Sequence, residues 1–136
     1  MRVTVARVVV AKPVGARETR PVVAVGWFVL ALVFVDEVLA LAAAAVWGSW
    51  AGGPLLAVAA ALTVVAVWWT FASPKAPYGG AVVRPVVKTL VFGLASLGLW
   101  QAGHPGWALA LLVFSVVVNT LALLPFVRRL VPEPSR

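Results

Sequence analysis

Two adjacent acids are the side chains with the clearest chemical potential in this sequence. Asp36 and Glu37 lie in a long apolar run, midway between Trp27 and Trp47. Those tryptophans are 20 residues apart, which is about 30 Å along a helix. If the run crosses a bilayer, the acids fall near its midplane, where a charge costs at least about 2.5–3.5 kcal/mol. Such acids either carry protons or cations, or bond to neighbouring helices as structural groups, and the sequence leaves both interpretations open.

The two acids cannot share one face of a helix, because adjacent positions diverge by about 100°. Asp36 begins a row of small residues with Ala40, Ala44 and Gly48, a pattern that lets another helix approach closely. We therefore expect Asp36 to face a helix contact and to serve structure. Glu37 should face a second neighbour, a cavity or another subunit. Two carboxylates this close should not both ionise away from water, so we expect Glu37 to be protonated at neutral pH with no cation bound.

Four further polar side chains complete the predicted intramembrane site. Lys88 is a candidate counter-ion, but it lies one turn past Arg84, only about 6 Å inside the interface. Its side chain is therefore expected to extend outward to water. Asn119 falls slightly on the cytoplasmic side of the midplane, and Thr63 and Ser96 fall near mid-depth. With the acids they can form one polar layer, in which Asn119 or Thr63 would bond to Asp36. Ordinary hydrogen bonding between helices, worth about 0.6 kcal/mol for each bond, is the preferred interpretation of all three.

Catalytic and metal chemistry find no support in the sequence. The chain has no cysteine, which excludes thiolate catalysis and thiolate metal sites. Its one histidine, His104, lies between Gly103 and Pro105 and is interpreted as a turn residue. No glycine-rich phosphate loop, metal-ligand spacing or activated serine is present. We predict that the protein is not an enzyme and has no metal or cofactor.

A membrane is the environment that this composition requires. The 136 residues are 63% hydrophobic and 11% charged, whereas soluble domains carry about 25% charged residues. We predict an all-α integral membrane protein, an up-down-up-down bundle of four helices over residues 21–128, because short connections force neighbours to run antiparallel. The predicted spans cover about residues 22–50, 54–73, 85–102 and 105–126, between a basic tail at 1–20 and a tail at 129–136.

The net charge of +7 is explained by topology rather than by nucleic-acid binding. Basic residues occur in the N-terminal tail, in the second connection with Lys75 and Arg84, and at the C-terminal end with Arg128 and Arg129, while the first and third connections contain none. Cytoplasmic segments are rich in Lys and Arg, which places both termini in the cytoplasm. The tail is expected to contact anionic lipids, or alternatively to dock a partner.

A family resemblance adds to these observations. It is carried by an acid in the first span, by the segments 70–77, 90–95 and 102–105, and by Asn119-Thr120. With these features, the sequence resembles the YrdB-like family of small bacterial membrane proteins over about residues 25–127. The resemblance implies a four-helix domain of unknown function in the bacterial cytoplasmic membrane. It also implies an acid at Glu37 and a second one near Lys88. A lysine at that place changes the expectation from a shared cation site toward an internal ion pair.

Three functions follow from these expectations. The first is proton- or cation-linked transport by the midplane acids; the small multidrug resistance family resembles this chain in outline only. The second is a non-catalytic accessory or assembly protein, as a homodimer or within a larger membrane complex. The third is a binder of lipid or another apolar molecule between helices. A water-reachable Glu37 would favour transport, and a sealed, hydrogen-bonded one a structural role.

Overall fold

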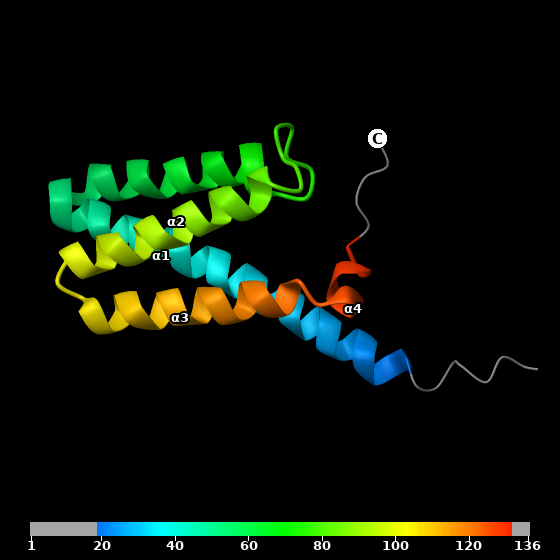
Figure 1. Ribbon diagram of the computed structural model, residues 1–136. Coiled ribbons are helices and arrows are strands. Elements are labelled where there is room, and N and C mark those ends of the chain that lie inside the picture. Colours follow the sequence, from blue (N-terminus) through cyan, green and yellow to red (C-terminus); the bar gives the residue numbers. More distant parts are fainter. Residues whose placement is uncertain (1–18, 132–136) are drawn as a thin grey trace, which may run out of the picture.

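The computed structural model describes residues 19–131, and every regular element in that part of the chain is helical. In chain order these elements are α1 (Thr19–Val67), the π-helix η1 (Trp68–Ala72), α2 (Val83–Gln101), α3 (Pro105–Ala122) and the short α4 (Pro125–Arg128) (Figure 1). The predicted all-α fold is confirmed. The tails predicted at 1–20 and 129–136 lie outside the described residues, apart from 19–20 and 129–131.

Helix α1 is bent into two arms by a glycine pair. Gly52 and Gly53 have non-helical backbone angles (φ −160°, ψ 17° and φ 79°, ψ −166°), and the positive φ of Gly53 is one that side-chain-bearing residues rarely adopt. Pro54 then fits the first turn of a new helix, where a missing N–H costs nothing. We call residues 19–51 the first arm and residues 54–67 the second arm. The second arm runs back beside the first (Figure 1).

The last predicted span is shorter than expected. It was predicted to reach Phe126, but α3 ends at Ala122, and Leu124 has extended angles (φ −58°, ψ 137°) before Pro125 opens α4. A proline breaks a helix that is already under way, because it has no N–H to donate and its ring clashes with the preceding turn, so α3 ends before Pro125. At its other end α3 begins as predicted with Pro105, after a turn in which Gly103 has φ 87°.

The basic residues of the described chain gather at one end of the bundle. The start of α1, the connection between η1 and α2, and α4 lie at that end, while the bend at Gly52 and the turn before Pro105 lie at the other (Figure 1). Arg84 Nη2 donates a 2.9 Å hydrogen bond to the carbonyl of Pro74 and so ties down the connection between η1 and α2. We call the end of the bundle that contains residues 73–82 the loop end; the sequence predicted that its basic segments lie on one side of a membrane.

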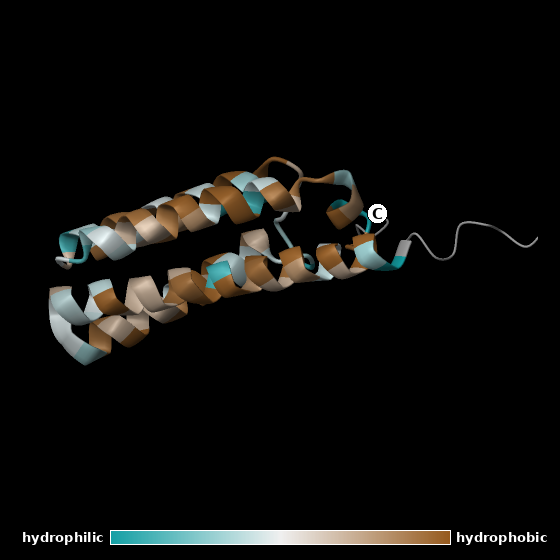
Figure 2. Ribbon diagram, turned by 90° about the horizontal axis from the view of Figure 1, so that it is seen from below, coloured by the Kyte–Doolittle hydropathy of each residue, from teal (hydrophilic) through white to brown (hydrophobic). Residues whose placement is uncertain are grey.

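Small side chains let the helices pack closely, and many large apolar side chains face outward. The core contains Ala40, Ala43, Ala95 and Ala108 together with Phe92, Leu99 and Leu111. Hydrophobic residues dominate along the helices, and hydrophilic residues are more frequent toward their ends (Figure 2). Large apolar side chains such as Leu55 and Trp107 are largely exposed. Three helical stretches, residues 20–72, 83–101 and 105–122, are long and apolar enough to cross a membrane by length and composition.

Candidate functional site

The adjacent acids of the first arm face two different helices, as their divergence on the helix predicted. Asp36 is fully buried and accepts hydrogen bonds from α3. Glu37 is only partly buried and forms an ion pair with α2. The acids therefore belong to two separate polar contacts, and not to one polar layer.

The Asp36 contact joins α1 to α3. Ser115 Oγ donates to Asp36 Oδ1 at 2.6 Å, and Asn119 Nδ2 donates to Asp36 Oδ2 at 2.9 Å. The same amide nitrogen also lies 2.9 Å from the carbonyl oxygen of Ser115. Both carboxyl oxygens thus have partners, and the exposed fraction of Asp36 is 0%. This closed arrangement serves helix packing, because it leaves the carboxyl no route to an external ligand.

The Glu37 contact joins α1 to α2. Lys88 Nζ lies 2.6 Å from Glu37 Oε1, and the side chains are 23% and 17% exposed. We expected Lys88 to extend outward to water, and this expectation is wrong. The long side chains of lysine and glutamate bridge the helices instead, which satisfies a charge that the apolar surroundings would otherwise penalise.

The acids also lie closer to the loop end of the bundle than the midplane that the tryptophan spacing predicted. Lys88 is five residues, or about 7.5 Å, from the start of α2, and Asn119 is three residues, or about 4.5 Å, from the end of α3. The first arm is longer than its neighbours and projects past them at the loop end (Figure 1). The position of Asp36 and Glu37 along α1 alone therefore predicts a greater distance from the loop-end termini of α2 and α3 than the structure shows.

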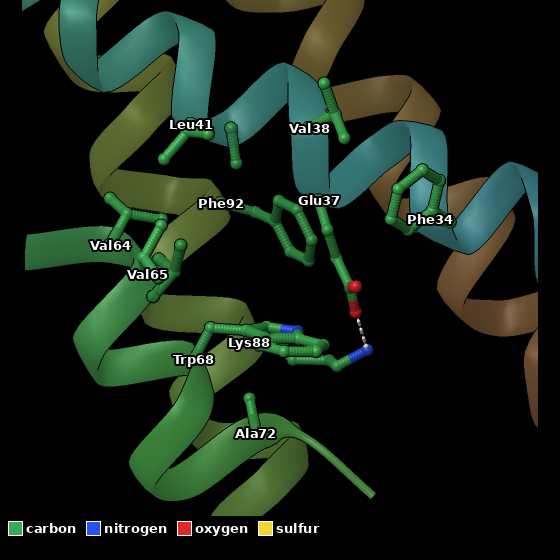
Figure 3. A pocket seen from close by; sticks show the side chains of 12 residues that line it. Phe34, Glu37, Val38, Leu41, Val64, Val65, Trp68, Ala72, Lys88 and Phe92 are labelled. Carbon is green, nitrogen blue, oxygen red and sulfur yellow. Dashed lines mark hydrogen bonds and ion pairs between the residues drawn. The ribbon is translucent and has the colours of Figure 1, made fainter. Parts of the chain in front are cut away.

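A partly open pocket of about 210 Å³ lies between the first arm, the second arm, η1 and α2. We call it the lateral pocket. Its wall is apolar, with Phe34, Leu41 and Val64 among the lining residues, and the Glu37–Lys88 pair forms part of it (Figure 3). An apolar cavity with a few convergent polar groups is the usual form of a small-molecule site.

Trp68 adds a hydrogen-bond donor to the lateral pocket. It is the first residue of η1 and lines the cavity, and its indole ring extends toward the Glu37–Lys88 pair (Figure 3). The indole Nε1 is buried and has no hydrogen-bond partner among residues 19–131. Single π-helical turns occur often at functional sites, and here the turn includes the 2.8 Å bond from Ser73 N to Trp68 O.

Two predicted members of the polar layer lie elsewhere. Thr63 is exposed on the second arm, and its hydroxyl donates to the carbonyl of Ala59 at 2.8 Å, the local bond that threonine commonly makes in membrane helices. Ser96 is buried on α2, but its hydroxyl finds no partner within the described part of the chain. Ser115 was not among the predicted site residues, although it stands four residues before Asn119 and so lies on the same face of α3.

The small-residue row contacts more than one neighbour. Ala40 is buried in the core, Ala44 is half-buried, and Gly48 is buried against the backbone of Leu56 in the second arm. Positions four apart in a helix turn by about 400°, so each step of the row drifts by about 40°. The row that begins at Asp36 on α3 therefore ends on the second arm, so its small residues allow close approach by more than one neighbouring helix.

Comparison with known protein families matches residues 31–116 to the family described as a protein of unknown function, DUF2568. This match covers more than half of the chain. The chain belongs to the DUF2568 family. The matched DUF2568 region includes Asp36, Glu37, Lys88 and Ser115. Comparisons with curated proteins and with solved structures give no match.

Proposed function

We propose that this DUF2568 protein is a four-span membrane protein that binds a small molecule of the bilayer in the lateral pocket. The observation that carries the proposal is the Glu37–Lys88 ion pair in the wall of an otherwise apolar cavity. Of the twelve lining residues, Glu37, Lys88 and Trp68 have polar side-chain atoms. Ionisable groups are expensive inside a membrane domain and are by default part of a functional site.

In the proposed membrane arrangement, the two arms of α1 each form one span, and α2 and α3 form the others. The loop end, with Arg20, Lys75, Arg84 and Arg128, lies in the cytoplasm, as the enrichment of basic residues on that side supports. We place the protein in the bacterial cytoplasmic membrane, in line with its resemblance to the YrdB-like family. Lipid would then cover the exposed apolar surface along the helices.

The proposal can be tested with four probes that share an oleyl chain and differ in the polar end. These are the oleyl-chain hydrocarbon, methyl oleate, oleate and oleyltrimethylammonium. Native mass spectrometry of the full chain released from detergent micelles measures the occupancy of each. A substitution that fills the cavity, Val64→Phe, should abolish specific occupancy by every probe that the wild-type protein binds, because Val64 is half-buried in the pocket wall.

The matched control is Leu62→Phe on the same arm. Leu62 is 62% exposed and does not line the lateral pocket, so this substitution should leave occupancy unchanged. Both variants are first compared with the wild-type protein by thermal unfolding, so that only folded protein is scored. Equal occupancy in Val64→Phe and Leu62→Phe would refute the proposal.

Proton- or cation-linked transport is a second candidate, favoured by one observation. Glu37 is 17% exposed and lines an open cavity, so it is placed to exchange a proton or to meet a cation. Lys88 already occupies the position of a bound cation, however, and a ligand cation would have to displace a tethered ammonium group. Tightest binding of oleyltrimethylammonium among the four probes would favour this candidate.

A further inference from the structure

The lateral pocket has unused hydrogen-bond donors. Trp68 Nε1 is buried without a partner in residues 19–131, and an unsatisfied buried donor is costly and calls for an explanation. Lys88 Nζ has three N–H bonds, and Glu37 accepts one of them; the described chain supplies no second acceptor. What the pocket can still recognise is therefore a hydrogen-bond acceptor.

The charges around the pocket select against an ionic ligand. Lys88 and Glu37 balance each other at 2.6 Å, and the nearby Asp36 is closed off by α3. An anion would be attracted by Lys88 but repelled by Glu37. A cation would meet Lys88 and would bring further donors to a site that already has them in excess. A neutral acceptor satisfies the donors without disturbing the pair.

The lining residues of the lateral pocket lie at different depths in the bundle. Lys88 and Ala72 lie toward the loop end, while Leu41 and Val64 line the pocket deeper in the bundle (Figure 3). A molecule with its polar end beside Lys88 would therefore extend its chain between the two arms of α1 toward the bilayer centre. This is the orientation of a lipid in the leaflet next to the loop end.

We propose that the lateral pocket takes a neutral, single-chain bilayer molecule whose polar end is an ester or ketone carbonyl, held by Trp68 Nε1 and Lys88. This inference rests on the proposed function, since it names the ligand class of the same pocket. Among the four oleyl probes, methyl oleate should bind most tightly. Because each hydrogen bond contributes about 0.5–1.5 kcal/mol, the bonds from the two donors should together raise its affinity above that of the hydrocarbon by about 5- to 150-fold.

Adjacent tryptophans supply the matched pair of variants. Trp68→Phe removes the indole N–H and keeps an aromatic ring, so it should lower the affinity for methyl oleate about 3- to 10-fold and leave that for the hydrocarbon unchanged. Trp69 is 68% exposed and does not line the lateral pocket, so Trp69→Phe should change neither affinity.

The outcomes separate this inference from the proposed function. If Val64→Phe abolishes occupancy but all four probes bind the wild-type protein equally, the pocket is real and the carbonyl preference is overturned. The preference is also overturned if oleate or oleyltrimethylammonium binds best, or if Trp68→Phe and Trp69→Phe behave alike. Occupancy that Val64→Phe does not alter overturns the proposed function itself.

Discussion

A methyl group at Gly48 should disrupt the contact between the two arms of α1. A Cβ atom placed there would lie 2.5 Å from the carbonyl oxygen of Leu56 and 2.8 Å from both Cα and N of Ala57. All three are backbone atoms, which cannot turn aside as a flexible side chain can. The shortest distance falls about 0.9 Å below the 3.4 Å at which ordinary contact begins. Gly48→Ala therefore requires the second arm to move away from the first.

Gly93→Ala is the control that isolates this clash. Gly93 lies in α2 with nothing within 4 Å of an added Cβ. Both substitutions gain the same helix propensity, about 1 kcal/mol for glycine to alanine, so this gain cancels in the comparison. The remaining difference in unfolding free energy is the cost of overpacking, about 1–3 kcal/mol. We expect Gly48→Ala to be less stable than Gly93→Ala by that amount.

The measurement is reversible unfolding of the purified protein in mixed micelles, with helix content followed as a denaturing detergent is added. Gly93→Ala should unfold at the same or a higher detergent fraction than the wild-type protein, and Gly48→Ala at a clearly lower one. Equal unfolding midpoints for the two variants would show that the second arm does not pack on Gly48, and would refute the arrangement of the arms.

Two further predictions concern the buried acid and the topology. Asp36→Ala removes the acceptor of both hydrogen bonds from α3 and should lower the unfolding free energy by about 1–3 kcal/mol. The control Thr63→Ala should change the unfolding free energy by less than about 0.5 kcal/mol, because that hydroxyl bonds within its own helix. Equal losses of stability in the two variants would contradict the structural role of Asp36. The chain has no cysteine of its own, and Gly106 and Gly80 both have open space for a side chain. An impermeant maleimide added outside cells should label Gly106→Cys but not Gly80→Cys. The reverse labelling would show that the topology is the opposite of the proposed one.

Local backbone chemistry made much of the fold predictable. Gly52-Gly53 and Pro54 signalled a break and a new helix, and Pro105 signalled the start of α3, because each acts on its own stretch of chain. Pro125 likewise ends α3 early, although the apolar run that predicted the last span continues to Phe126. Apolar character alone does not carry an established helix through a proline.

The candidate site was less predictable because it depends on how the helices slide past one another. Periodicity within α1 separated Asp36 from Glu37 correctly, and Asn119 lies beside Asp36 as expected. The axial offset of α1 against α2 is a tertiary property, however, and depth counted along each helix separately places Lys88 too shallow to reach Glu37. Nothing in the local sequence of Trp68 and Trp69 indicates which of the two faces the pocket.

The two acids together explain how the pocket wall is fixed. The Glu37–Lys88 ion pair and the 3.1 Å hydrogen bond from Trp47 Nε1 to Gln101 Oε1 both hold the first arm on α2. The Asp36 bonds reach α3 from a position about 100° round the helix, so contacts in two directions set the rotation of the first arm about its axis. The loop tied down by Arg84 joins η1 to α2, the elements that carry Trp68 and Lys88. The donors and the acid of the lateral pocket thus come from separately anchored parts of the chain, as a preformed binding site requires.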